Sequence, residues 1–200
     1  MILERLCMDK IQIIAQTIGI FGMIANFLSF QQKKQKGVVA FQFFAALLFA
    51  VNFLLIKAYI GALLNVIGVI RATVFVNREK LNAEHPAWLL FFVLAFSSTY
   101  PLVFTVFGTN LTLKNAIIEI LPVIAMILST ISFRLTKSKD IRRFGLFSSP
   151  MWLIYNIFCF SIGAIISEIL NLISIIIGII RFDLKKEETE ENTSFDEALK

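Results

Sequence analysis

The chain of 200 residues is 58% hydrophobic and only 16% charged, whereas soluble domains average about 45–50% apolar and about 25% charged residues. This composition excludes an ordinary soluble domain and indicates an integral membrane protein, with the lipid bilayer as its surroundings. The formal net charge of +5 does not indicate a nucleic-acid partner, because basic residues of membrane proteins collect in cytoplasmic loops.

Seven predominantly apolar stretches follow one another along the chain, and a helical span needs about 20 such residues. The predicted spans cover residues 11–30, 38–57, 59–77, 87–108, 116–134, 146–162 and 164–182. An open sheet cannot cross lipid, because the backbone groups at its edges would lack hydrogen-bond partners. We therefore expect an all-α membrane protein with seven transmembrane helices.

The distribution of lysine and arginine predicts the orientation. Apart from Arg71, which lies inside a span, four of the nineteen basic residues fall on the side of the N-terminus and fourteen on the other side. The richer side faces the cytoplasm, so the N-terminus is expected outside and the C-terminus inside. Arg71 and Arg181 lie near the inner ends of their spans, where we expect them to extend to the interface; a functional role is the alternative. Residues 183–200 are polar and acidic, which predicts a disordered cytoplasmic tail.

The two halves of the chain resemble each other. MIANFLSF at 23–30 and MILSTISF at 126–133 share four positions at a constant offset of 103 residues, and a basic loop follows each. Further on, YIGALLN at 59–65 and SIGAIIS at 161–167 share an Ile-Gly-Ala motif. Chance matches between isoleucine-rich helices are the alternative, but the common order of motifs favours an internal repeat.

Such a repeat divides the membrane region into three parts. Residues 11–77 form one three-helix bundle, 87–108 form a linker helix, and 116–182 form the second bundle. Because one linker span separates them, both bundles have the same orientation in the membrane, as in some transporters. A binding site is expected between the two bundles.

Several segments resemble the YgjV-type family of bacterial inner-membrane proteins. They are SFQQKK (29–34), NFLLIKAYIGALLN (52–65) with Arg71, LPVIAMILST (121–130), WLIYN (152–156), SIGA (161–164) and NLISIIIGIIRF (171–182). That family is grouped distantly with the SWEET and PQ-loop (MtN3-like) transporters, whose fold has three, one and three helices with the N-terminus outside. The resemblance implies a multi-pass protein of the bacterial cytoplasmic membrane that transports a small polar solute by alternating access.

The resemblance also implies site residues. In the sugar-transporting relatives, one asparagine on the third span and one on the seventh face a central pocket, which carries this role to Asn65 and Asn171. The Pro-Gln pair of those relatives is absent, since the first span has Gln16 without a proline. Pro122 and Pro150 remain as the candidate hinge residues.

Asn52 and Asn156 lie shortly before the two Ile-Gly-Ala motifs. A buried amide without partners is unfavourable in lipid, so each must face protein, water or ligand. With Asn65 and Asn171 they are predicted to form one polar layer that binds hydroxyl or amide groups of the solute. The alternative is that the asparagines bond to one another and fasten the helices.

Four further residues could take part in transport. Trp152 and Tyr155 could stack on the solute, or pack in the core or against lipid. Glu119 and Glu168 lie within predicted spans, where ionisable residues are functional candidates. They are predicted to accept a proton in coupled transport, with an interfacial carboxylate as the alternative.

No arrangement in the sequence indicates catalysis. No cluster of His, Cys or carboxylate residues has metal-ligand spacing, and neither a glycine-rich phosphate loop nor a nucleophile elbow is present. We therefore expect no catalytic residues, no metal, no cofactor and no enzymatic activity. The alternative to a transporter is a non-transporting membrane scaffold or sensor. The oligomeric state stays open.

Overall fold

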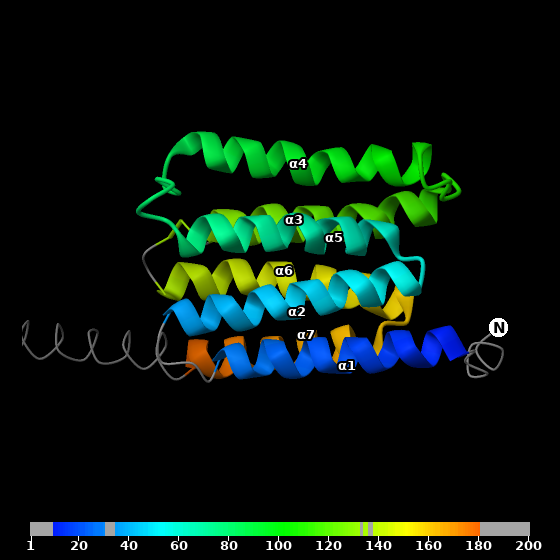
Figure 1. The fold of residues 1–200 in the computed structure, drawn as a ribbon, viewed down its shortest axis with the longest axis horizontal. Coiled ribbons are helices and arrows are strands. Elements are labelled where there is room, and N and C mark those ends of the chain that lie inside the picture. The colour runs from blue at the N-terminus through cyan, green and yellow to red at the C-terminus, as the bar shows by residue number, and fades with distance from the viewer. Residues whose placement is uncertain (1–9, 31–34, 133, 136–137, 181–200) are drawn as a thin grey trace, which may run out of the picture.

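The structure is a computed structural model that describes residues 10–30, 35–132, 134–135 and 138–180. Within these residues the chain forms seven α-helices and no β-strand (Figure 1). The helices are α1 (Lys10–Phe30), α2 (Gln35–Leu55), α3 (Tyr59–Val76), α4 (Pro86–Thr105), α5 (Leu113–Ser132), α6 (Ser138–Cys159) and α7 (Ile162–Gly178). The prediction of an all-helical protein is confirmed, and one helix lies at each predicted span.

Most helix boundaries agree with the predicted spans to within a few residues, and α6 differs most. It begins at Ser138 rather than at residue 146, because its first turns continue the helix through charged sequence. By length and composition, α1, α3, α4 and α5 can cross a membrane, whereas α2 and α7 contain shorter apolar stretches. Arg181 and the predicted tail of residues 183–200 lie outside the described residues.

Six of the described helices form a closed ring of contacts. In order around the ring, α1 packs on α2, α2 on α3, α3 on α5, α5 on α6, α6 on α7, and α7 on α1. Helix α4 packs outside the ring against α3 and α5, and Figure 1 shows it as a separate layer at the top. In this ring α2 stands opposite α6, and α3 stands opposite α7.

The ring has two chemically different ends. At the end that we call the joint end, short turns connect α2 to α3 and α6 to α7 (Figure 1, right). The opposite end, which we call the basic end, carries the α3–α4 loop and the start of α6. Its described basic residues are Arg78, Lys80, Arg134, Lys139, Arg142 and Arg143.

The turn between α2 and α3 reverses the chain within three residues. Lys57 has a positive φ of 61°, which is the left-handed conformation. The Lys57 N–H donates to the Leu54 carbonyl, and the Ala58 N–H donates to the Phe53 carbonyl. This pair of bonds is the Schellman motif, which satisfies the last carbonyls of a helix through a left-handed residue.

The turn between α6 and α7 repeats this geometry. Phe160 has a positive φ of 57°, its N–H donates to the Ile157 carbonyl, and the Ser161 N–H donates to the Asn156 carbonyl. Each of these residues follows its counterpart in the first turn by 103 positions, the offset of the matching segments at 23–30 and 126–133. The Ile-Gly-Ala motifs are offset by 102 residues. They are therefore shifted by one residue relative to the two Schellman turns, whose offset is 103.

Helices α1 and α7 approach each other closely near the joint end. A Cβ atom added at Gly163 would lie 2.2 Å from the backbone C and O atoms of Gly19. Real side chains do not approach backbone so closely, so only glycine at position 163 permits this contact. The ring therefore closes at α1 and α7 through direct packing of backbone on backbone.

We expect the substitution Gly163→Ala to destabilise the protein by about 1–3 kcal/mol or more, because the added methyl group overpacks rigid backbone. Gly68→Ala is the control, since a Cβ atom there would lie 3.2 Å from the flexible Cε of Met126. Thermal unfolding of both variants in the same detergent measures the difference. Equal melting temperatures would show that α1 and α7 are not packed in this way.

Candidate functional site: a polar cavity inside the helix ring

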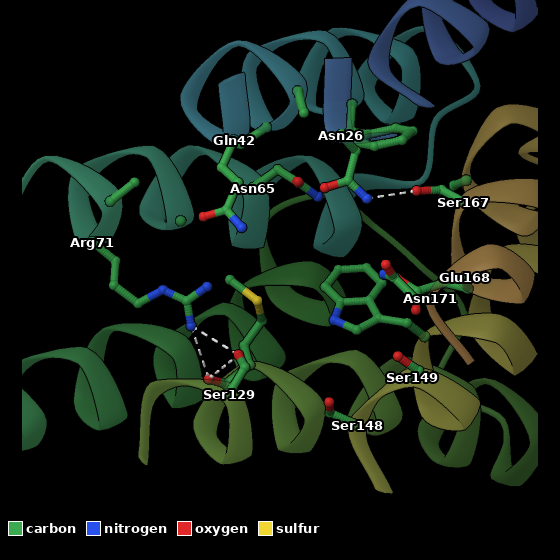
Figure 2. Close-up of a pocket in the computed structure, with 18 of the residues that line it drawn as sticks. Asn26, Gln42, Asn65, Arg71, Ser129, Ser148, Ser149, Ser167, Glu168 and Asn171 are labelled. Carbon is green, nitrogen blue, oxygen red and sulfur yellow. Dashed lines mark hydrogen bonds between the residues drawn. The ribbon is translucent and has the colours of Figure 1, made fainter. Parts of the chain in front are cut away.

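A cavity of about 440 Å³ lies inside the ring, within the range of small-molecule sites. All six ring helices line it, and none of its described lining residues comes from α4 (Figure 2). The polar lining residues are Asn26, Gln42, Asn65, Arg71, Arg78, Ser129, Ser148, Ser149, Asn156, Ser167, Glu168 and Asn171. The rings of Phe49, Phe53, Phe75 and Trp152 supply aromatic surface. Such a lining suits a small solute with polar groups.

The cavity is closed toward the joint end and open toward the basic end. Its closed floor includes Phe53, Asn156 and Ala164, which are only 2%, 2% and 4% exposed. At the other end the lining reaches Arg78, in the loop after α3, whose side chain is 40% exposed and forms an ion pair with Glu84. The cavity lining is therefore buried at the joint end and accessible at the basic end.

Tyr155 packs in the core beside the cavity floor. It is fully buried, and its hydroxyl accepts a hydrogen bond of 2.9 Å from the Gly61 N–H. Its ring lies 5.9 Å from the rings of both Phe53 and Trp152. Of the two aromatic residues predicted to stack on a solute, Trp152 lines the cavity and Tyr155 supports the floor.

Asn52 lies outside the cavity and is fully buried among three segments. Its Nδ2 donates to the Ala15 carbonyl at 2.7 Å, and its Oδ1 accepts from the Ser161 hydroxyl at 2.6 Å. Gln16 supports the same turn from α1, because its Oε1 accepts from the Ile162 N–H at 2.9 Å. Asn52 thus fastens helices, as the alternative to solute binding held, although through Ala15 and Ser161 rather than through another asparagine. The role of Gln16 was missed, although a lone glutamine in an apolar span must find a partner.

The other three predicted asparagines line the cavity. Asn65 on α3 donates its Nδ2 to the Gly61 carbonyl of its own helix at 2.8 Å. Asn171 on α7 lies beside the carboxyl group of Glu168 (Figure 2). Asn156 on α6 is almost fully buried, and among the described residues its Oδ1 has no hydrogen-bond partner. The structure thus brings Asn65, Asn156 and Asn171 to one cavity.

The two predicted intramembrane glutamates differ in position. Glu168 lines the cavity, with Ser149 and Asn171 beside it, and its buried Oε2 has no hydrogen-bond partner in the described part of the chain. Glu119 on α5 also has a buried Oε2 without such a partner, but it does not line this cavity. Pro122 and Pro150 lie inside α5 and α6. Their hinge role and the proton-coupling role stay predictions.

Arg71 points into the protein, so the expectation that it extends to the interface is wrong. Its Nη1 donates to the hydroxyls of Ser129 and Thr130, each at 2.8 Å, and to the Met126 carbonyl at 3.3 Å. Its guanidinium carbon lies 5.7 Å from the centre of the Phe96 ring. The acceptors on α5 keep the positive charge of Arg71 inside the ring. The sequence signal for this inward position was the pair of adjacent hydroxyl residues, Ser129 and Thr130, in the span that packs against α3.

A comparison with protein families identifies the chain. The model of the family Imp-YgjV, described as bacterial inner membrane protein, matches residues 13–186. The chain belongs to this family. No curated protein and no solved structure matches it. The match of this YgjV-family protein extends over nearly all of α1 and over α2 to α7, so it includes every helix that lines the cavity.

In this YgjV-family protein we expect Asn52→Ala to lower stability by about 1–3 kcal/mol, because it removes two buried hydrogen bonds to other segments and leaves the Ser161 hydroxyl without this acceptor. Asn65→Ala removes one bond within a single helix and should cost less than about 1 kcal/mol. Thermal or denaturant unfolding in detergent measures both. If the Asn65 variant were the less stable of the two, the fastening role of Asn52 would be refuted.

Proposed function

We propose that this YgjV-family protein transports a small polar solute across the bacterial inner membrane by alternating access between two helical bundles. The observation that carries the proposal is the polar cavity, which is closed toward one end of the ring and open toward the other. A cavity lined by amides, hydroxyls and charges within apolar helices suits a solute that cannot cross lipid alone.

The two proposed bundles are α1 to α3 and α5 to α7, with α4 as the linker. Two features support this division. If the bundles are equivalent, α1 corresponds to α5 and α3 to α7. The contact between α1 and α7 then has the contact between α5 and α3 as its counterpart, and both contacts are present. The Schellman turns of the two bundles also repeat at an offset of 103 residues.

Alternation requires the cross-bundle contacts at the joint end to break. Four hydrogen bonds join the bundles there: Gln16 with Phe160 and Ile162, Asn52 with Ser161, and Gly61 with Tyr155. Releasing them would open the floor of the cavity, while the basic ends of the helices would approach each other. With the N-terminus outside, as the distribution of basic residues favours, the present arrangement is open to the cytoplasm.

A non-transporting scaffold or sensor is the second candidate function. Asn52 favours it, because its side chain is hydrogen-bonded to α1 and, across the bundles, to Ser161, as would suit a rigid protein. In both proposals the protein catalyses no reaction. The buried Oδ1 of Asn156 and Oε2 of Glu168 line the cavity and have no hydrogen-bond partner among the described residues, which favours transport over the scaffold.

Cysteine labelling tests the open cavity and the orientation together. In a background without Cys7 and Cys159, Ala72→Cys places a thiol in the cavity wall toward the basic end. We expect a membrane-impermeant maleimide to label it in inside-out vesicles and not in intact spheroplasts. Val66→Cys, on the half-exposed outer face of α3, is the lipid-facing control that stays unlabelled. Labelling only in spheroplasts would reverse the orientation, and labelling in neither preparation would contradict the open cavity.

A ligand screen tests solute binding. Sugars, amino acids, nucleosides, vitamins and polyamines are tested for an increase in melting temperature of the purified protein. A ligand at 100 times its Kd adds about 2.7 kcal/mol of stability. We expect the double variant Asn65→Ala, Asn171→Ala to lose the increase, because both side chains line the cavity. No increase with any compound, together with no uptake of radiolabelled compounds into proteoliposomes, would favour the scaffold or sensor.

A further inference from the structure

The residues that line the cavity repeat along the chain at the offset of the two Schellman turns. Of the ten lining residues in α5, α6 and α7, seven have another lining residue 103 positions earlier. These seven pairs are Asn26 and Ser129, Ala45 and Ser148, Ala46 and Ser149, Phe49 and Trp152, Phe53 and Asn156, Asn65 and Glu168, and Gly68 and Asn171. Such regular pairing is expected if the two bundles face one cavity in the same way. By this offset Asn65 corresponds to Glu168 rather than to Asn171.

The paired positions differ in chemistry between the two bundles. Those of α2 and α3 are small or apolar apart from Asn65, whereas those of α6 and α7 are polar apart from the aromatic Trp152. The polar residues that take the place of alanine, phenylalanine or glycine of the first bundle are Ser148, Ser149, Asn156 and Asn171. At these positions a solute therefore meets polar groups on one side and mainly apolar surface on the other.

Glu168 supplies the charge of the polar wall, and it is the only acidic residue among the described residues that line the cavity. Its carboxyl group lies beside Ser149 and Asn171 (Figure 2). Within the described part of the chain its buried Oε2 has no hydrogen-bond partner, and the group has no ion pair. A carboxylate accepts hydrogen bonds, and an ammonium group offers three donors together with a positive charge. The chemical match to this wall is therefore a protonated amine.

An aromatic surface continues from the polar wall into the floor of the cavity. Trp152 follows Ser149 by three residues on α6, so the two side chains share one face of the helix. The ring of Trp152 lies 6.2 Å from that of Phe53, which lies 6.3 Å from that of Phe49. An indole attracts a cation more strongly than a phenyl ring does, and all three rings offer apolar contact. The apolar body of an amine fits this surface.

The two arginines that line the cavity lie apart from this site. Arg71 is bonded to hydroxyl groups of α5, and it follows Asn65 by six residues, about 9 Å of helix rise toward the basic end. Because Asn65 is the counterpart of Glu168, the two have the same depth in equivalent bundles. Arg78 forms its ion pair with Glu84 at the basic end. The amine site therefore uses neither guanidinium group.

We infer that the transported solute is an organic amine bound as its cation, with the ammonium group at Glu168 and the apolar body on Trp152. The inference rests on the proposed transport function and names its substrate class. It also gives a reason for the unequal pairs: the α6–α7 wall binds the charged group, and the small residues of the α2–α3 wall leave room for the body.

Compounds that share a carbon skeleton and differ in charge test the inference on the full-length protein in detergent. 2-Phenylethylamine, tyramine, tryptamine, cyclohexylamine and hexylamine are each compared with the alcohol and the carboxylate of the same skeleton. The wild type and the variants are measured in parallel, so that an effect of a compound on the micelle is common to all of them. We expect at least one amine to raise the melting temperature by several degrees, and its alcohol and carboxylate to raise it less.

Glu168→Gln keeps the shape of the side chain and removes its charge, so it should weaken binding of the active amine by roughly thirtyfold or more. Glu119→Gln is the matched control, because Glu119 also has a buried Oε2 without a described partner but lies outside the cavity. The affinity of that variant should stay unchanged. Trp152→Phe installs the residue type of its counterpart Phe49 and should weaken amine binding severalfold, because a phenyl ring attracts a cation less strongly.

Two results would overturn the inference and leave the transport proposal in place. The first is an amine affinity that Glu168→Gln leaves unchanged. The second is a neutral sugar or alcohol that stabilises as well as any amine, enters proteoliposomes and loses its effect in the Asn65→Ala, Asn171→Ala variant. The absence of stabilisation by every amine would also refute the substrate class, and the absence of uptake of every compound into proteoliposomes would then remove the transport proposal as well.

Discussion

The lipid core contains no water, so each polar group that enters it must find its partner within the protein or face an enclosed polar space. This constraint sorts the polar side chains of the ring into two sets. Asn52 and Gln16 satisfy backbone and hydroxyl groups on neighbouring segments, and they hold the joint end together. Asn156 and Glu168 instead line a cavity, and each has a buried acceptor atom without a hydrogen-bond partner in the part of the chain that the structure describes. The same residue types therefore stabilise the fold at one depth and form a candidate binding site at another.

The joint end shows how close packing and polar bonding depend on each other. Gly163 allows α7 to contact the backbone of α1, and this contact places the start of α7 within reach of Gln16. The left-handed conformation of Phe160 turns the chain so that Ser161 reaches Asn52. A larger residue at position 163 would separate the helices and remove these bonds together, so we expect the closed floor to behave as one cooperative unit.

The sequence predicted the helices well and the site in part, for physical reasons. Apolar runs of sufficient length determine helices regardless of tertiary contacts, so seven helices were found at the seven predicted spans. Whether a given polar residue faces a cavity or a neighbouring helix depends on how its helix is rotated about its own axis. Helices that are apolar on all sides give no sequence signal for this rotation. Asn65 and Asn171 were assigned through a family resemblance and do line the cavity. Asn52 was grouped with Asn156 by sequence order, although the backbone register pairs it with Tyr155.

The energy scale of the joint end decides between a rigid and a moving ring. Four cross-bundle hydrogen bonds close it, and side-chain hydrogen bonds inside membrane proteins average only about 0.6 kcal/mol each. Together they contribute a few kcal/mol, whereas a ligand with a micromolar Kd binds with about 8 kcal/mol. A ligand shifts a conformational equilibrium only by the difference between its affinities for the two states. About a third of such a binding energy equals the polar contribution to closure, so the hydrogen bonds alone do not make the joint end rigid, and the close packing at Gly163 has to be counted with them.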